Sequence, residues 1–226
     1  MNGNKIMATD PAWDHRKEEY RALCNEKAVC PICQERIICK FGEINQHHFA
    51  HHHNTDCPGS HDNEEHMTGK AILYGFLMAR YGHEATVDLE YYIPELKTTC
   101  DLLVQFQDGR KWAVEFYCGG KAQALRDKIN YYEEQNILTS WLLSQQLCKD
   151  NSSEKTVIIS ARDKLLIDKT GIDKYYIGEW YKRIVINRQR TDLPLDGSSE
   201  GTLMYLDVEQ KELRIFRALQ SEYHHQ

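Results

Sequence analysis

The spacing of apolar residues changes along the chain, and each kind of spacing indicates a helix or a strand. Where apolar residues recur every three or four positions the pattern predicts an amphipathic helix, and where they alternate or run together it predicts a strand. In chain order the pattern predicts helices over 10–24 and 62–80, a strand over 84–93, a strand pair within 99–117, a helix over 121–135 and a strand over 137–143. A helix separates the last strand from the earlier ones, so we expect a crossover and some parallel pairing in a mixed α/β sheet.

The strand pair within 99–117 carries two carboxylates in an apolar setting, Asp101 in the first strand and Glu115 in the second. A buried carboxylate is costly unless it is paired or holds a metal ion, so the two acids together indicate a site. Their facing depends on the turn. A two-residue loop at Asp108-Gly109 would send them to opposite faces, whereas a three-residue loop with Gly109 left-handed would pair them directly. We expect the three-residue loop, because it makes chemical sense of both acids.

A second group of reactive side chains lies upstream of the longer helix. It contains Cys30, Cys33 and Cys57, and a histidine-rich run that includes His48 and His51. A Cys-x-x-Cys pair places two thiolates on one cation, and one imidazole with a further thiolate completes a tetrahedral zinc site. His51 is the expected fourth ligand and His48 the alternative. A redox pair or surface histidines are the competing interpretations, but the segment after the Cys-x-x-Cys pair resembles a hairpin, which favours zinc.

Composition narrows the class of protein. At 226 residues the chain can hold one sizeable domain and a small module. No apolar run approaches the length of a membrane span, and the N-terminal segment lacks a signal-peptide core. A cytoplasmic location is therefore expected, where cysteines more often bind metal than pair. The net charge of −6 argues against a protein coated in basic surface but leaves room for a local basic groove.

The motifs, taken in order, resemble the CoiA-like competence proteins. The resemblance covers about 28–144 and rests on Cys30-Pro-Ile-Cys33, His48-Phe-Ala-His51, Cys57, Glu64-Glu65-His66 with Lys70, Asp101, Glu115 and the segment from Arg126 to Trp141. That family joins a small zinc module to a nuclease domain of the PD-(D/E)XK, or restriction-endonuclease-like, type. The resemblance therefore implies an αβββαβ core with a mixed central sheet.

The resemblance also implies a function, the metal-dependent hydrolysis of DNA phosphodiester bonds. The family suggests a role in DNA uptake and recombination, while the short chain and the unmatched C-terminal third leave defence against foreign DNA as the other role. Asp101 and Glu115 would bind one or two Mg²⁺ or Mn²⁺ ions through their oxygens, as these hard cations prefer. A helix acid, Glu65 or Glu64, would assist. DNA is expected as the partner over RNA, no membrane is expected, and a homodimer or a protein partner is left open.

One position departs from the nuclease pattern, which places a lysine, or in some relatives a glutamine, two residues after the strand glutamate. This sequence has Tyr117 there, on the same face as Glu115. A phenol donates a hydrogen bond but carries no positive charge. We expect Lys121, Arg126 and Lys128 on the outer face of the following helix, and any of them could supply that charge, with Lys121 as the first choice. The alternative is a catalytically inactive module of the nuclease fold that binds nucleic acid or a protein partner.

The expected division of the chain is an N-terminal helix in 1–27, the zinc module in 28–61, the nuclease core in 62–150 and a β-rich extension in 151–226. Within the extension we expect a strand over 155–161, mixed helix and turn over 162–180, a basic strand over 182–190, a loop over 191–201 and a final hairpin over 202–218. The basic strand could follow a phosphate backbone, although an ordinary solvated strand has the same pattern.

Overall fold

The structure is a computed structural model that describes residues 8, 15–42, 47–52, 57, 63–119, 122–151, 156–158, 174–185 and 203–221. The chain divides into two compact units. The first contains residues 1–71 and 92–99, and the second contains residues 72–91 and 100–226. This division does not test the domain boundaries expected from the sequence, and those boundaries stay a prediction.

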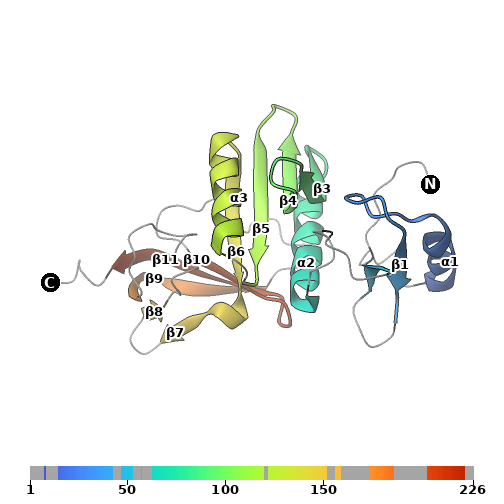
Figure 1. Cartoon of the computed structure of the whole chain (residues 1–226). Coiled ribbons are helices and arrows are strands. Elements are labelled where there is room, and N and C mark those ends of the chain that lie inside the picture. The colour runs from blue at the N-terminus through green and yellow to red at the C-terminus, as the bar shows by residue number, and fades with distance from the viewer. Residues whose placement is uncertain are drawn as a thin grey trace. The chain divides into compact units, whose positions relative to one another are not determined.

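The first unit contains a helix and a two-stranded hairpin (Figure 1). The elements are α1 (Lys17–Lys27), β1 (Ile37–Lys40) and β2 (His48–His51), and the two strands pair antiparallel. The buried thiols of Cys24 and Cys39 lie in the same small core, together with Phe41. The helix expected to end at residue 24 continues to Lys27, where the Ala28 N–H still donates to the Cys24 carbonyl at 2.8 Å. Residues 10–14 of that expected helix lie outside the described residues.

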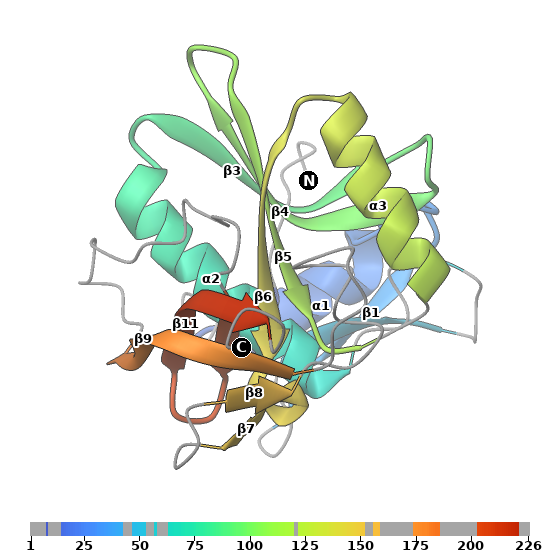
Figure 2. The ribbon, with the colours of Figure 1, turned by 90° about the vertical axis from the view of Figure 1, so that its left-hand side faces the viewer.

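A nine-stranded sheet in the order β3-β4-β5-β6-β10-β11-β9-β8-β7 forms the frame of the second unit (Figures 1 and 2). Its strands are β3 (Ala85–Ile93), β4 (Thr98–Phe106), β5 (Lys111–Tyr117), β6 (Leu138–Ser144), β7 (Lys149–Asn151), β8 (Thr156–Ile158), β9 (Lys174–Val185), β10 (Leu203–Asp207) and β11 (Glu212–Ser221). The helices are α2 (Glu64–Tyr81), which belongs to this unit from Ile72 onward and to the first unit before that, and α3 (Ala122–Glu134). A short 3₁₀ turn, η3 (Gln145–Leu147), follows β6. The prediction of a mixed α/β fold with helices near 62–80 and 121–135 is confirmed.

The crossover through α3 gives the parallel pairing that the sequence predicts. Strand β6 runs parallel to β5, with Glu115 opposite Trp141, and it also runs parallel to β10, with Leu143 opposite Tyr205. The other paired strands of the sheet whose register is defined run antiparallel. The order α2-β3-β4-β5-α3-β6 matches the αβββαβ order implied by the family resemblance.

Two helices cover opposite faces of the strands β4 to β6, as Figure 2 shows. Side chains of a strand alternate between faces, so Leu102 and Val114 pack with Leu73 and Phe76 of α2. Tyr117 faces the other way and packs with Leu125 of α3, Leu143 and Tyr205. Odd-numbered positions of β5 therefore face α3, and this alternation decides where Glu115 points.

The C-terminal strands extend the same sheet. The final hairpin is confirmed, with its turn between Asp207 and Glu212, where the Asp207 carboxylate accepts two backbone N–H groups. The mixed helix and turn expected over 162–180 is wrong for 174–180, which lie in β9 and pair with β11 because this aromatic-rich stretch favours strand. Part of the strand expected over 155–161 is β8, and 182–185 of the basic strand end β9. Residues 186–190 and the expected loop over 191–201 lie outside the described residues.

Candidate functional site

The turn between β4 and β5 brings the two strand carboxylates together. The Phe106 N–H donates to the Arg110 carbonyl at 2.9 Å, so the loop contains three residues, and Gly109 has a φ of +89°. Strands β4 and β5 then pair Leu102 with Val114, and the same register continued by one residue brings Asp101 opposite Glu115. The three-residue loop is therefore confirmed, and the two acids project from one face.

Both carboxylates lie inside the protein. Asp101 is 5% exposed and Glu115 is 2% exposed. The Asp101 Oδ2 atom accepts the backbone N–H of Phe116 at 2.8 Å, a contact that holds this carboxylate across the strand pair. Two buried acids on neighbouring strands repel each other unless one is protonated or a positive charge lies nearby.

That charge comes from α3, where the Lys128 Nζ atom lies 2.7 Å from the Glu115 Oε2 atom. The Tyr132 hydroxyl, one helical turn further on, donates to the Glu115 Oε1 atom. The expectation that Lys128 lies on the outer face of α3 is wrong. It is three residues after Leu125 and four before Tyr132, both buried. Its position between two inward residues, together with an unpaired acid on the facing strand, was the signal that could have placed it.

Burial governs the electrostatics of this group. It raises the pKa of Glu115 from the ordinary 4.5 to about 7, which outweighs the opposing effect of Lys128, and the charge of Asp101 adds to the rise. Burial lowers the pKa of Lys128, but attraction to Glu115 and Asp101 outweighs burial, so the pKa of Lys128 lies above its ordinary value. Lys128 therefore stays charged, and Glu115 exchanges a proton near neutral pH.

The remaining predicted site residues are less closely tied to this pair. Tyr117 projects from the same face of β5 as Glu115 but is 8% exposed among apolar side chains. Lys121 lies outside the described residues, and Arg126 is exposed on α3. Glu65 lies in the first turn of α2, in the other compact unit, so its participation stays a prediction.

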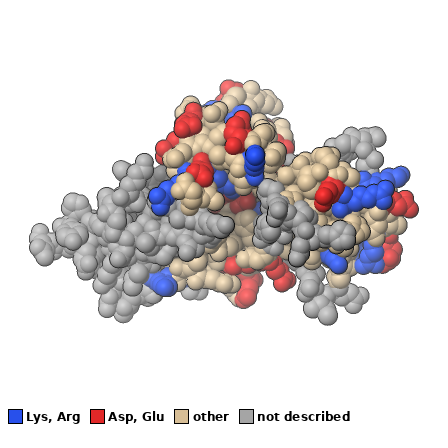
Figure 3. Space-filling model, in the orientation of Figure 1, with Lys and Arg blue, Asp and Glu red and all other residues tan. Residues whose placement is uncertain are grey.

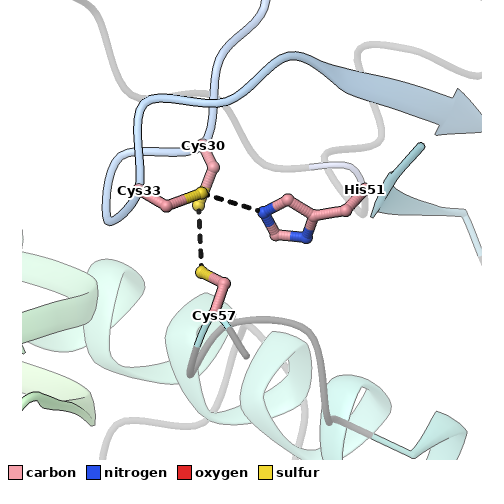
Figure 4. Close-up of side chains that lie close together, drawn as sticks. All are labelled: Cys30, Cys33, His51 and Cys57. Carbon is pink, nitrogen blue, oxygen red and sulfur yellow. Dashed lines mark hydrogen bonds between the residues drawn. The ribbon is translucent and has the colours of Figure 1, made fainter. Parts of the chain in front are cut away.

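The four predicted zinc ligands converge in the first unit. One donor atom from each of Cys30, Cys33, His51 and Cys57 lies within 4.8 Å of the others (Figure 4). The Cys30 and Cys57 sulfurs are 3.7 Å apart, and the Cys33 sulfur is 3.2 Å from His51 Nε2. Two thiolates on a tetrahedral zinc ion, with Zn–S bonds of about 2.3 Å, are separated by about 3.8 Å, so the donor set fits a metal ion such as zinc. The alternative ligand, His48, is not one of these four.

Local backbone structure presents these ligands. A tight turn follows Cys30, whose carbonyl accepts the Gln34 N–H at 2.9 Å and whose sulfur lies 3.4 Å from the Ile32 N–H. The hairpin then pairs Ile37 with His51, which returns the imidazole to the turn. The expectation that a hairpin follows the Cys-x-x-Cys pair is confirmed.

Two family models match the chain, one for each group of site residues. The N-terminal domain of competence protein CoiA matches residues 12–60, which contain the cysteine and histidine cluster. The nuclease-like domain of competence protein CoiA matches residues 62–188, more than half of the 226 residues, and this range contains Asp101 and Glu115. Comparison with curated proteins and with solved structures gives no match. No helix among the described residues is long and apolar enough to cross a membrane. The chain belongs to the competence protein CoiA family, with the N-terminal domain of that family followed by its nuclease-like domain.

Proposed function

We propose that the chain is a metal-dependent nuclease of the PD-(D/E)XK type that hydrolyses phosphodiester bonds of DNA, in DNA uptake and recombination or in defence against foreign DNA. The observation that carries this proposal is the pairing of Asp101 and Glu115 on one buried face of β4 and β5. Membership of a family with a nuclease-like domain supports it.

The two acids fit a divalent cation. Glu115 already holds a cationic nitrogen at 2.7 Å, so the space in front of its carboxylate accepts a positive ion. Asp101 and Glu115 offer carboxylate oxygens, the ligands that Mg²⁺ and Mn²⁺ prefer. When bound, such an ion polarises the phosphoryl oxygen and lowers the pKa of a bound water.

The protein groups around the acids hold them in place. The Phe116 N–H fixes Asp101, and the Tyr132 hydroxyl fixes one oxygen of Glu115. Ligands whose orientation is set by neighbouring hydrogen bonds bind metal more tightly than mobile ones. On the face drawn in Figure 3, Lys and Arg side chains of the described residues are interspersed with Asp and Glu. We propose that DNA binding depends on the metal site and on the cations close to it.

The cluster in the first unit is proposed as a structural zinc site. Four protein donors would fill the tetrahedral coordination that zinc prefers and would leave no open position for a substrate. Zinc at this site would stabilise a unit whose hydrophobic core is small.

A cleavage assay tests the nuclease proposal. Full-length, zinc-loaded protein is incubated with plasmid, linear duplex and single-stranded DNA, and with RNA, in Mg²⁺ or Mn²⁺, with chelator as the blank. We expect the wild-type protein to cleave DNA. Asp101→Asn and Glu115→Gln should each abolish this cleavage without loss of zinc. Glu133→Gln, a change at an exposed position of α3, should leave cleavage intact. Metal-dependent cleavage retained in both acid variants would contradict the site assignment.

The second candidate function is a catalytically inactive module of the same fold that binds nucleic acid or a protein partner. Two observations favour it: Tyr117 lies in an apolar cluster at the position of the expected lysine, and Lys128 neutralises Glu115. Binding of DNA without cleavage in either metal would support this function and contradict the first.

A further inference from the structure

We propose that Lys128 is an exchangeable cation of the Glu115 site. Lys128 pairs with Glu115 while no divalent ion is bound. When a divalent ion binds, the Lys128 side chain turns away from Glu115 and becomes available to a DNA phosphate. This inference rests on the proposed nuclease function and adds a metal-triggered step to it. The step involves only a change of partner for the ammonium group.

The contacts of Glu115 show why an exchange is needed. Its Oε1 atom accepts from Tyr132 and its Oε2 atom pairs with Lys128, so both oxygens are engaged from α3. A divalent ion shared with Asp101 requires one of them. Each carboxylate oxygen has two lone-pair positions, so the neutral hydrogen bond from Tyr132 can persist beside the ion, whereas the ammonium of Lys128 is a second cation that the ion repels.

Lys128 is the side chain that can move. Tyr132 is 1% exposed, and its ring lies against Tyr131 and Trp141, with centroids 5.9 and 6.4 Å away. The Lys128 side chain is 17% exposed, and its ammonium lies at the end of a flexible four-carbon stem. Rotation about that stem can carry the charge to solvent without disturbing the packing of α3.

Charge balance favours the same exchange. Asp101, Glu115 and Lys128 together carry a net charge of −1 when all three are ionised. Adding a divalent ion while Lys128 remains would place two cations against the same carboxylate in a buried site, where like charges repel strongly. Lys128 leaves as a charged group, since a solvated ammonium stays protonated at neutral pH, and a phosphate is the ligand that such an ammonium would meet at a nuclease site.

Lys128, once released from Glu115, would supply the positive charge that Tyr117 lacks at the position where the nuclease pattern has a lysine. The tyrosine shares the face of Glu115 but lies among apolar side chains, and a phenol brings no positive charge. Lys128 reaches the same carboxylate from the helix. In this arrangement Lys128 is the counter-ion of Glu115 while no divalent ion is bound, and it is the cation that contacts the DNA phosphate once a divalent ion is bound.

Amine labelling of the full-length, zinc-loaded protein tests the exchange. Brief reaction with an acetylating reagent is followed by peptide mass spectrometry, with and without Mn²⁺, and Mn²⁺ binding is measured in parallel by calorimetry. We expect Mn²⁺ to increase labelling of Lys128 several-fold and to leave labelling of the exposed Lys111 unchanged. Asp101→Asn should remove both the binding and the increase.

The outcomes separate this inference from the proposed function. Mn²⁺ binding with unchanged labelling of Lys128 overturns the exchange and leaves the nuclease proposal standing. Absence of Mn²⁺ binding overturns the proposed metal site and the exchange with it.

As a second test, Lys128→Met should still bind Mn²⁺ but cleave DNA more slowly, by on the order of a hundredfold, with partial recovery in Lys128→Arg. A Lys128→Met variant that cleaves at the wild-type rate also overturns the inference.

Discussion

Replacing Glu115 with glutamine should remove a pH dependence of folding stability that the buried carboxylate creates. Burial raises the pKa of Glu115 in the folded chain from the ordinary 4.5 to about 7. The folded chain therefore binds this proton more tightly than the unfolded chain. The stabilisation is complete below about pH 4.5 and is lost as the pH rises through about 7.

The size of the effect follows from the two pKa values. At about 1.4 kcal/mol for each pKa unit, the difference corresponds to about 3 kcal/mol in the free energy of unfolding. About 2 kcal/mol of this should be lost between pH 5.5 and 8.0. Glutamine keeps a hydrogen-bond acceptor for Tyr132 but does not titrate, so its curve should lack this loss.

Urea unfolding followed by tryptophan fluorescence measures the difference. Wild type and Glu115→Gln are compared at several pH values in this window, zinc-saturated and without added divalent ion, and the exposed Glu133→Gln serves as the control. Titrating groups that do not interact with Glu115 contribute equally to both curves and cancel in the difference. Parallel curves for wild type and Glu115→Gln across the window would refute the argument.

Three further changes test separate parts of the structure. Gly109→Ala should destabilise the protein by about 1 kcal/mol in urea unfolding, because φ is +89° there although a Cβ would meet no atom within 4 Å. An unchanged stability would argue against the bulged turn. Cys30→Ser should lose the bound zinc by elemental analysis, whereas His48→Ala should retain it; the reverse result would reassign the ligands. Tyr132→Phe should cost about 1.5–3 kcal/mol, because a buried carboxylate oxygen loses its donor, and a neutral result would mean that Glu115 finds another partner.

The features that the sequence predicted correctly depend on local chemistry. The turn at Asp108-Gly109 needs only a residue that tolerates positive φ, and the register of β4 and β5 then follows from that turn. The cysteine and histidine cluster follows from ligand spacing, which constrains the chain before any packing does. These two local rules predicted the acid pair and His51 as the fourth member of the cysteine and histidine cluster.

The features that it did not predict depend on tertiary contacts. Lys128 was placed outside because only apolar residues were used to define the inner face of α3, and a buried lysine is explained only by the acid it meets on β5. The parallel pairing of β10 with β6 joins segments distant in the sequence, and no local pattern encodes that neighbour. The aromatic content of 174–180 favours strand, but strand propensity depends on the neighbouring strand, and that neighbour, β11, is distant in the sequence.

Anomalous diffraction from crystals of the zinc-loaded protein grown with Mn²⁺ is the most direct test of the acid pair as a catalytic metal site. We expect a manganese peak bridging Asp101 and Glu115, with Lys128 no longer within hydrogen-bond distance of Glu115. Crystals that show metal at the cysteine and histidine cluster but none at the acid pair, with Lys128 still bound to Glu115, would contradict the account.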